Sequence, residues 1–287
     1  MGAIYRKEIK SYFTSMIGYV FIAFFLVVIG IYFTAYNLFS GYANFEYALQ
    51  SVAFVFFILS PILTMRVMAE EKKQKTDQLL LTAPVSVEQI VLGKYLAVAT
   101  VYMVVIAICC IYPLILSRFG NVTLATAYST ILGFTLMGLA FLAMGVFIST
   151  CTENQIVSAV VSFVVTLVVY YMTSLISFLP TDNRSALIIL SVLALIIWGI
   201  MYFMMRNLIV SVIGFLVCEG ALVALYFLHR SFFDGIVSKI FSWLSFTDRF
   251  STFTGGAIEL SAIVYMVSVI FLFLFLSCQA IKKRRWR

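Results

Sequence analysis

The chain has 287 residues, of which 63% are hydrophobic and 11% are charged, whereas charged residues make up about 25% of a soluble domain. So few charges cannot cover a water-facing surface, which excludes a soluble enzyme, a disordered protein and a nucleic-acid-binding module. The formal net charge of +7 therefore has to be interpreted from where the basic residues lie along the chain. The composition is that of a membrane protein.

Long apolar segments recur along the chain. Crossing a hydrocarbon core of about 30 Å takes about 20 helical residues, and about eight segments have that length. They are apolar on every face, whereas the strands of a membrane barrel alternate apolar and polar residues. We therefore predict an all-α transmembrane bundle of six core spans and an additional pair, near residues 16–38, 47–67, 92–116, 126–149, 155–178, 186–205, 208–228 and 259–281.

The distribution of Lys and Arg predicts the orientation of these spans. Positive residues close to a span remain in the cytoplasm. With both termini placed in the cytoplasm, most of the nineteen Lys and Arg residues are cytoplasmic, and an even number of spans agrees with this placement. The opposite side then holds Arg118, Arg184, Arg230, Lys239 and Arg249.

Two short segments have the pattern of amphipathic helices that lie at the membrane surface. Residues 1–14 predict a helix at the cytoplasmic interface, with an apolar face of Tyr5, Ile9, Tyr12, Phe13 and Met16. Residues 231–246 predict a helix on the outer side, with an apolar face of Phe233, Ile236, Val237, Ile240 and Leu244. A simple connector is the alternative for each.

The longest cytoplasmic loop covers residues 69–90. Its first part extends the second span into water, and the spacing of Glu71 and Lys75 predicts an ion pair along a helix. Pro84 disfavours helix at the residue before it, and Ser86 followed by Gln89 is a capping-box pattern that predicts the start of a new helix. The segment between is therefore expected to be a short helix fixed at both ends.

Three consecutive leucines, Leu79, Leu80 and Leu81, lie in that short segment. Exposed apolar surface with a polar rim usually marks a site of protein interaction. Burying two of these leucines would contribute about 3–6 kcal/mol, at about 1.5–3 kcal/mol for each side chain. We expect a cytoplasmic partner here; the alternative is that the leucines pack on the spans of the chain itself.

Two polar features lie inside the predicted spans. Glu219 is an ionisable residue within a span, either a contact in a transport route or a group hydrogen-bonded to a neighbouring helix. The fifth span carries hydroxyl groups at helical spacing, which either line a route or form contacts between helices. These residues are Ser158, Ser162, Thr166, Tyr170, Thr173 and Ser177.

The sequence lacks the common catalytic and metal-binding motifs. It contains no phosphate-binding loop of the G-x-x-x-x-G-K-[ST] form, no H-E-x-x-H helix and no C-x-x-C pair. His229, the single histidine, lies near the outer end of a span, where an interface anchor is the simplest role. The five Cys residues lie in or beside apolar segments and are expected to be free thiols. We therefore expect neither catalysis nor a metal site in this chain.

Three stretches resemble the permease subunits of ABC-2 type transporters. The loop residues 68–72, Thr76 and 79–86 are similar to the loop that follows the second span in that family. Residues 5–13 resemble its N-terminal interface helix. Residues 246–261 and the basic end at 282–286 are most like the gliding-motility-associated branch.

The resemblance implies a division of labour. ATP and Mg would be bound and ATP hydrolysed by a separate ATPase subunit, and this chain would be a single ABC-2 type transmembrane domain over residues 1–287, working as a permease in a bacterial plasma (inner) membrane, with export as the expected direction. A second permease copy, identical or related, would complete a route lined largely by the second and fifth spans. The additional pair at 186–228 departs from the common six-span pattern.

The resemblance also implies which residues contact the ATPase. The first coupling helix would consist of Glu70, Glu71, Thr76, Leu79, Leu80, Leu81, Thr82 and Pro84. A second, shorter contact at residues 151–154 would include Thr152 and Glu153. Two other functions stay open at this point, a secondary carrier that works alone and a membrane scaffold that anchors cytoplasmic proteins.

Overall fold

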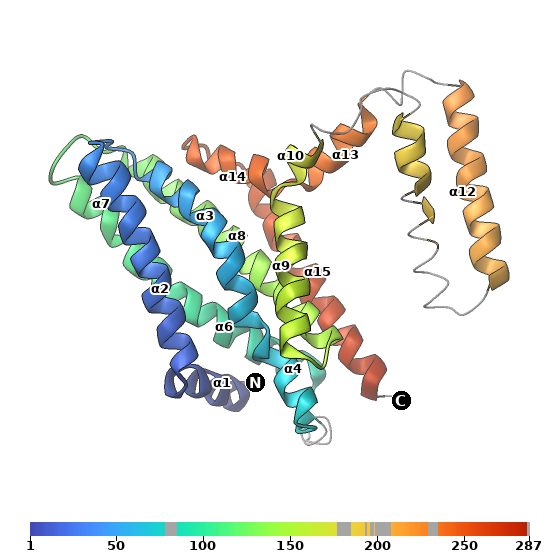
Figure 1. Ribbon diagram of the computed structural model, residues 1–287, viewed down its shortest axis with the longest axis horizontal. Coiled ribbons are helices and arrows are strands. Elements are labelled where there is room, and N and C mark those ends of the chain that lie inside the picture. The colour runs from blue at the N-terminus through green and yellow to red at the C-terminus, as the bar shows by residue number, and fades with distance from the viewer. Residues whose placement is uncertain are drawn as a thin grey trace. The chain divides into compact units, whose positions relative to one another are not determined.

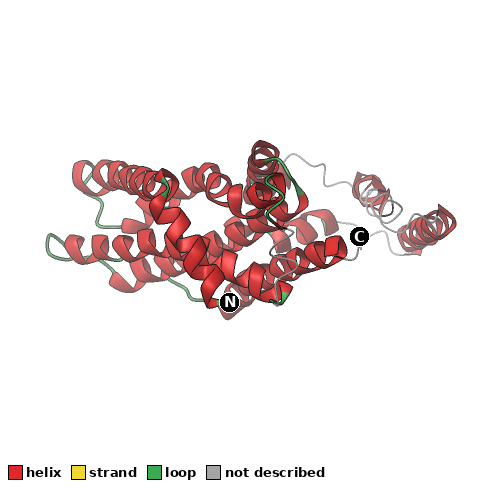
Figure 2. Cartoon of the chain, turned by 90° about the horizontal axis from the view of Figure 1, so that it is seen from below, coloured by secondary structure: helices red, strands yellow, loops and turns green. Residues whose placement is uncertain are grey.

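The structure, a computed structural model, describes residues 1–77, 85–176, 185–192, 194–195, 198, 208–228 and 235–285. Every regular element within these residues is a helix (Figures 1 and 2), which confirms the predicted all-α class. All five cysteines are free, also as predicted. The chain divides into two compact units, Met1–Val168 with Arg249–Arg287, and Val169–Asp248, and each is described by itself. The single domain over 1–287 stays a prediction.

Five helical stretches of the first unit are long and apolar enough to cross a membrane. They correspond to the first four predicted spans and to the last one. The total of eight spans and the cytoplasmic termini stay predictions. The five stretches are Met16–Phe39, Phe45–Lys73, Val87–Leu116, Leu124–Cys151 and Leu260–Lys283.

Three of these stretches are interrupted helices. The first is α2 (Met16–Phe33), which continues as the π-helix η1 (Thr34–Phe39). The second is α3 (Phe45–Thr64), which is separated from α4 (Arg66–Lys73) by a turn at Met65. The third is α6 (Val87–Cys109), followed by α7 (Ile111–Leu116). The other described helices with residues in this unit are α1 (Gly2–Thr14), α8 (Leu124–Cys151), α9 (Gln155–Tyr170), α14 (Phe246–Thr254) and α15 (Leu260–Arg285).

Helix α8 is the centre of the first unit, where it packs against α3, α6 and α15. Its glycines let neighbouring helices approach closely, since a Cβ atom at Gly138 would lie 2.3 Å from the Tyr102 hydroxyl. That hydroxyl donates a hydrogen bond to the Phe134 carbonyl at 2.8 Å. Phe134 also packs against the buried rings of Phe25 and Phe56. The core therefore joins three spans around α8.

The predicted fifth span at 155–178 is not one helix. Helix α9 ends at Tyr170, and α10 (Met172–Ile176) follows after a turn at Tyr171. The hydroxyl of Thr247 donates a hydrogen bond to the Tyr170 carbonyl, which satisfies an acceptor left free at the end of the helix. The sequence pattern alone missed this break, because the partner comes from a distant part of the chain.

The second unit contains the described part of the segment at 186–228, which the sequence predicts to be an additional pair of spans. Helix α12 (Leu208–Leu228) lies against the helical residues described between 185 and 198, since the Ser191 hydroxyl contacts Glu219 and the Trp198 ring lies over Gly214. These two contacts run in opposite chain directions and therefore define an antiparallel pair. The rest of the predicted span at 186–205, namely residues 193, 196–197 and 199–205, lies outside the described residues.

The predicted outer helix at 231–246 is shorter in the structure. It is α13 (Ile236–Leu244), and residues 231–234 lie outside the described residues. Ser245 ends it because its hydroxyl accepts the Asp248 N–H at 3.1 Å, which caps a new helix, α14 (Phe246–Thr254). Val237 is buried against Ala186, but Leu244, also predicted on the apolar face, is exposed.

Candidate functional site at the polar end of the first unit

The predicted coupling residues gather at one end of the first unit, which we call the polar end. It consists of α1, α4, the first turns of α6 and the last turn of α8, and both chain termini lie toward it in Figure 1. The described members of the prediction, Glu70, Glu71, Thr76, Thr152 and Glu153, lie here. The other members lie outside the described residues: Leu79, Leu80, Leu81, Thr82 and Pro84.

Helix α4 ends in a defined turn. The Thr76 N–H donates to the Glu71 carbonyl at 3.0 Å and the Lys75 N–H to the Lys72 carbonyl at 3.1 Å, which is the Schellman pattern of a helix end. Lys75 has a φ of 58°, a left-handed conformation that costs a non-glycine residue about 1–2 kcal/mol. The turn thus sets the direction in which the chain leaves α4. On the far side of the loop, the Ser86 hydroxyl accepts the Gln89 N–H at 3.3 Å, which confirms the predicted cap of α6.

Four charged side chains meet beneath this turn, and we call them the charge cluster: Lys7, Glu8, Glu71 and Lys94. The Lys94 Nζ is within 2.9 Å of Glu71 Oε2 and 3.1 Å of Glu8 Oε1, and it donates to the Val67 carbonyl at 2.6 Å. Lys7 pairs with the second Glu71 oxygen at 3.0 Å. Two positive and two negative charges from α1, α4 and α6 thus compensate one another.

The charge cluster corrects the sequence interpretation. Glu71 was expected to pair with Lys75, but α4 ends at Lys73 and Glu71 pairs with Lys7 and Lys94 instead. The charge distribution along the sequence predicts only that Lys94 lies on the cytoplasmic side, not that it joins α1 to α4. A signal was present, since Lys94 is the single Lys or Arg between Val87 and Cys109.

The charge cluster changes the pKa of Lys7. Partial burial lowers the pKa of its ammonium, but the hydrogen bond and the charge of Glu71 raise it by more, so the pKa of Lys7 lies above its ordinary value. Lys7 is therefore charged at neutral pH, and its attraction to Glu71 is retained until the solution is strongly alkaline.

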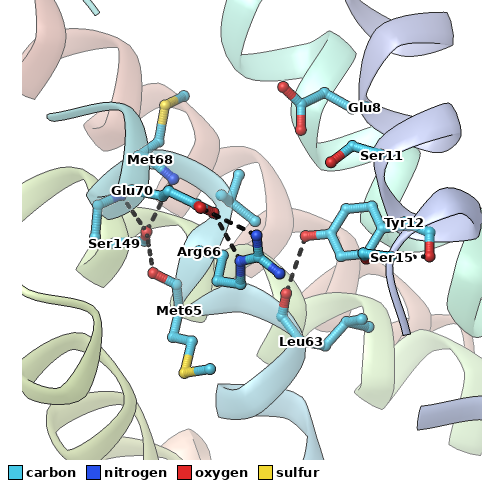
Figure 3. A network of polar contacts seen from close by, with 12 residues as sticks. Glu8, Ser11, Tyr12, Ser15, Leu63, Met65, Arg66, Met68, Glu70 and Ser149 are labelled. Atoms are coloured by element: carbon cyan, nitrogen blue, oxygen red, sulfur yellow. Dashed lines mark hydrogen bonds and ion pairs between the residues drawn. The ribbon is translucent and has the colours of Figure 1, made fainter. Parts of the chain in front are cut away.

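A single hydroxyl joins the break between α3 and α4 to the last turn of α8. The Ser149 Oγ accepts the N–H groups of Met68 at 3.0 Å and Ala69 at 3.1 Å, and it donates to the Met65 carbonyl at 3.2 Å (Figure 3). The Lys72 ammonium in addition donates to the Thr150 carbonyl. The extension of the second span is therefore fixed to the end of the fourth.

A second set of contacts fixes α1 to the same break (Figure 3). The buried Tyr12 hydroxyl donates to the Leu63 carbonyl at 3.0 Å, and burial raises the pKa of this phenol. Arg66 binds Glu70 through two hydrogen bonds of 2.7 and 3.0 Å. Glu70 is therefore engaged within α4 itself, whereas Glu71 reaches α1 and α6.

The predicted second contact follows α8 directly. The Thr152 hydroxyl donates to the Ile148 carbonyl at 3.3 Å, and the Asn154 side chain accepts the Ile156 N–H at 2.9 Å at the start of α9. Glu153 is exposed between them. Because Ser149 and Thr150 contact α4, the two predicted coupling elements share one end of the bundle.

The hydroxyl face of α9 is turned into the protein. Ser158, Ser162 and Thr166 are buried, and Thr166 donates to the Ser162 carbonyl at 2.8 Å. Within the described part of the chain, the hydroxyls of Ser158 and Ser162 have no hydrogen-bond partner. Burial keeps this face away from lipid, as both interpretations of it require.

The rest of the predicted hydroxyl stripe has other surroundings. In the second unit, Thr173 contacts the Ser245 hydroxyl at 2.6 Å and donates to the Asp248 carboxylate at 3.3 Å, so it fixes the start of α14. The side chain of Tyr170 is partly buried. Ser177 lies outside the described residues.

Glu219 also lies in the second unit. Its Oε2 accepts the Ser191 hydroxyl at 3.0 Å, so it contacts the neighbouring helical segment, one of the two interpretations of this residue. Its buried Oε1 has no hydrogen-bond partner among the described residues. Nor do three His, Cys, Asp or Glu side chains in the described ranges group in a way that could hold a metal ion.

In the part of the chain that the structure describes, five apolar helices of spanning length indicate a multi-pass membrane protein. A family model described as ABC-2 family transporter protein matches residues 31–278. The chain belongs to this family, and it is thus a permease component of an ABC transporter. A search of curated proteins found none that matches the chain.

Proposed function

We propose that this chain is the membrane-spanning subunit of an ATP-driven exporter and that its ATPase docks at the polar end. ATP and Mg would be bound by that partner, which hydrolyses the ATP. A second permease copy, identical or related, would complete the transporter. The polar end would face the cytoplasm of a bacterium, with the chain in the inner membrane and both termini on the cytoplasmic side.

The observation that carries this proposal is the junction between α4 and α8. The two elements expected to contact an ATPase leave the bundle side by side, because Ser149 and the Thr150 carbonyl hold α4 against the end of α8. A partner that pushed on either element would therefore move the second and fourth spans together. An ATPase that drives transport needs such a connection, because its movement must reach more than one span.

The proposal includes eight spans. To the five long helices it adds α9, α12 and the segment at 186–205. At 1.5 Å per residue, the 21 residues of α12 cover about 30 Å, the thickness of a hydrocarbon core. The antiparallel contacts of Ser191 and Trp198 along α12 support a pair of spans that returns to the same side of the membrane.

The proposed route follows the buried face of α9. The Ser158 and Ser162 hydroxyls are buried and have no hydrogen-bond partner in the described residues, so they would bind a polar group of a substrate when this face opens during transport. Placement in the gliding-motility-associated branch is part of the proposal as well, on the residue pattern at 246–261. Gliding itself is not inferred from it.

The proposal is tested by affinity purification of the tagged chain from its native membrane, with identification of the cytoplasmic subunits by mass spectrometry. We expect an ATPase with a phosphate-binding loop, together with two permease copies. The variant Leu80→Asp should lose the ATPase but still insert into the membrane, because it places a charge in the predicted apolar docking surface. Leu80→Met, which keeps the surface apolar, is the matched control and should retain the ATPase.

Each other result selects a different function. A stoichiometric ATPase that co-purifies with Leu80→Asp contradicts docking through this loop. A cytoplasmic partner without a nucleotide-binding fold favours a membrane scaffold. Substrate uptake by the purified chain without nucleotide favours a secondary carrier.

A further inference from the structure

Two helix ends flank the predicted coupling segment, the end of α4 and the beginning of α6, and we call them its stems. A loop transmits force to the membrane only where its stems are fixed to each other or to the spans. The Ser86 cap is a hydrogen bond within the start of α6, so it does not connect α6 to α4. The connection between the stems comes from Lys94, which lies about two turns inside α6.

Lys94 has a complete set of partners. An ammonium group has three N–H donors, and here Glu71 Oε2, Glu8 Oε1 and the Val67 carbonyl lie 2.9, 3.1 and 2.6 Å from Nζ. The side chain is 1% exposed. Two of the three acceptors, Glu71 and Val67, belong to α4, and the third belongs to α1. A buried ion with every donor satisfied allows few alternative positions of its partners.

The surroundings of Lys94 extend this connection to α1. A Cβ atom at Gly93 would lie 3.2 Å from the Ile4 side chain, so α1 crosses α6 at the residue next to Lys94. The Tyr5 hydroxyl contacts the Thr100 hydroxyl at 3.0 Å, and Lys7 returns from α1 to Glu71 at 3.0 Å. The three helices thus meet at one buried cation.

We propose that Lys94 is the positioning residue that makes α1, α4 and the start of α6 move as one body when the ATPase acts on the loop. The proposal rests on the proposed function for its motor, but the connection itself is a property of this chain. Lys94 touches no nucleotide and no substrate in this role; it acts through Glu71 and Glu8.

The first experiment needs no partner. Spin labels are placed on the exposed residues Lys73 and Gln89, one on each stem, through Lys73→Cys and Gln89→Cys in a background without the five native cysteines. In lipid nanodiscs, we expect a narrow distance distribution for the parent protein and a clearly broader one with Lys94→Met. An unchanged distribution overturns the proposal, whether or not an ATPase is found.

The matched control is Lys282→Met. Lys282 also pairs with a glutamate of α6, Glu88 at 2.5 Å, but both side chains are about half exposed, and the pair connects α6 to α15 rather than to α4. We expect it to leave the distance distribution unchanged. Should Lys94→Met fail to accumulate in the membrane, Glu71→Gln removes the same charge pair with little change of shape, and the same broadening is expected.

The second experiment measures coupling in the complex with its co-purified ATPase. Lys94→Met should assemble with the ATPase in the ratio of the parent protein but lose the stimulation of ATP hydrolysis that the permease confers on each assembled complex. A purely structural role would reduce the yield of complex and leave hydrolysis per complex unchanged, which would overturn the proposal. Absence of any ATPase contradicts the proposed function, while the spin-label result still decides the connection between the stems.

Discussion

The two glutamates Glu46 and Glu71 lie near opposite ends of the same spanning stretch, Phe45–Lys73, and their surroundings differ. Glu71 accepts Lys7 and Lys94, one on each oxygen. Glu46 lies in the first turn of α3 and is 4% exposed, yet neither of its carboxylate oxygens has a hydrogen-bond partner in the described residues. Its place in the first turn puts it near the positive end of the α3 dipole, which favours a carboxylate.

This difference separates a charge that holds helices together from one that does not. Removing one member of a buried, compensated cluster leaves the others uncompensated, which is strongly destabilising. Removing a buried charge that has no partner relieves a cost instead. The polar end is therefore expected to be sensitive to neutral substitutions that the opposite end of the same span tolerates.

The largest effect is expected for Glu71→Ala. The substitution removes one of the two carboxylates that pair with Lys94 and the carboxylate that pairs with Lys7. Breaking a buried ion pair in this way lowers the free energy of unfolding by about 3–5 kcal/mol. The measurement is denaturant unfolding of the purified protein in detergent. Glu88→Ala, which removes the exposed partner of Lys282, should leave the midpoint unchanged, and equal losses in the two variants would abolish the distinction between buried and exposed pairs.

Ser149→Ala tests the junction between α4 and α8. The substitution leaves the Met65 carbonyl and the N–H groups of Met68 and Ala69 without the Ser149 hydroxyl, and a buried polar group left unsatisfied costs about 1–3 kcal/mol. The control, Thr135→Val, removes a hydroxyl that bonds within α8, to the Ile131 carbonyl. Hydrogen exchange of the α4 amides should increase in Ser149→Ala and not in the control; similar protection in both would show that α4 is held by other contacts.

Gly145→Ala tests how closely α8 and α3 approach beside this junction. The new methyl carbon would lie 2.2 Å from the Thr64 hydroxyl and 2.8 Å from its Cβ, and such overpacking costs about 1–3 kcal/mol. Gly30→Ala is the matched control, because among the described residues no atom beyond its chain neighbours and its own helix backbone lies within 4 Å of the added Cβ, and alanine favours the helix by up to about 1 kcal/mol. We expect thermal unfolding at a lower temperature for the first variant and at an equal or higher temperature for the second.

Local sequence patterns were sufficient to predict part of the fold and of the candidate site. The length of the apolar segments predicted the helical class and the five helices of spanning length found in the described residues. The Ser86 and Gln89 pair predicted the start of α6, where the hydrogen bond is now observed. These features depend on residues close together in the sequence, so the sequence carries their signal directly.

Contacts between distant residues could not be predicted in this way. Lys94 of α6 pairs with Glu8 of α1, and Ser149 of α8 accepts a backbone hydrogen bond from α4. Helical spacing predicts neither pair. For the same reason the Glu71 pairing was assigned within its own helix, and α9 was extended beyond Tyr170, where Thr247 bonds its last carbonyl. Hydrophobic periodicity specifies which face of a helix is buried, but not which polar group of another helix that face will contact.

The smallest effect is expected for Glu46→Gln, which makes it the sharpest comparison with Glu71→Gln. Both substitutions replace a carboxylate with an amide of nearly the same shape on the same span. At Glu71 the change removes one of the two negative charges of the charge cluster. At Glu46 it removes a charge whose oxygens have no hydrogen-bond partner in the described residues, so the stability of Glu46→Gln should be unchanged or rise by about 1 kcal/mol. The measurement is thermal unfolding of the two variants under the same conditions. If Glu46→Gln lowered the unfolding temperature as much as Glu71→Gln, the Glu46 charge would itself be compensated, and ion pairs would stabilise both ends of the span.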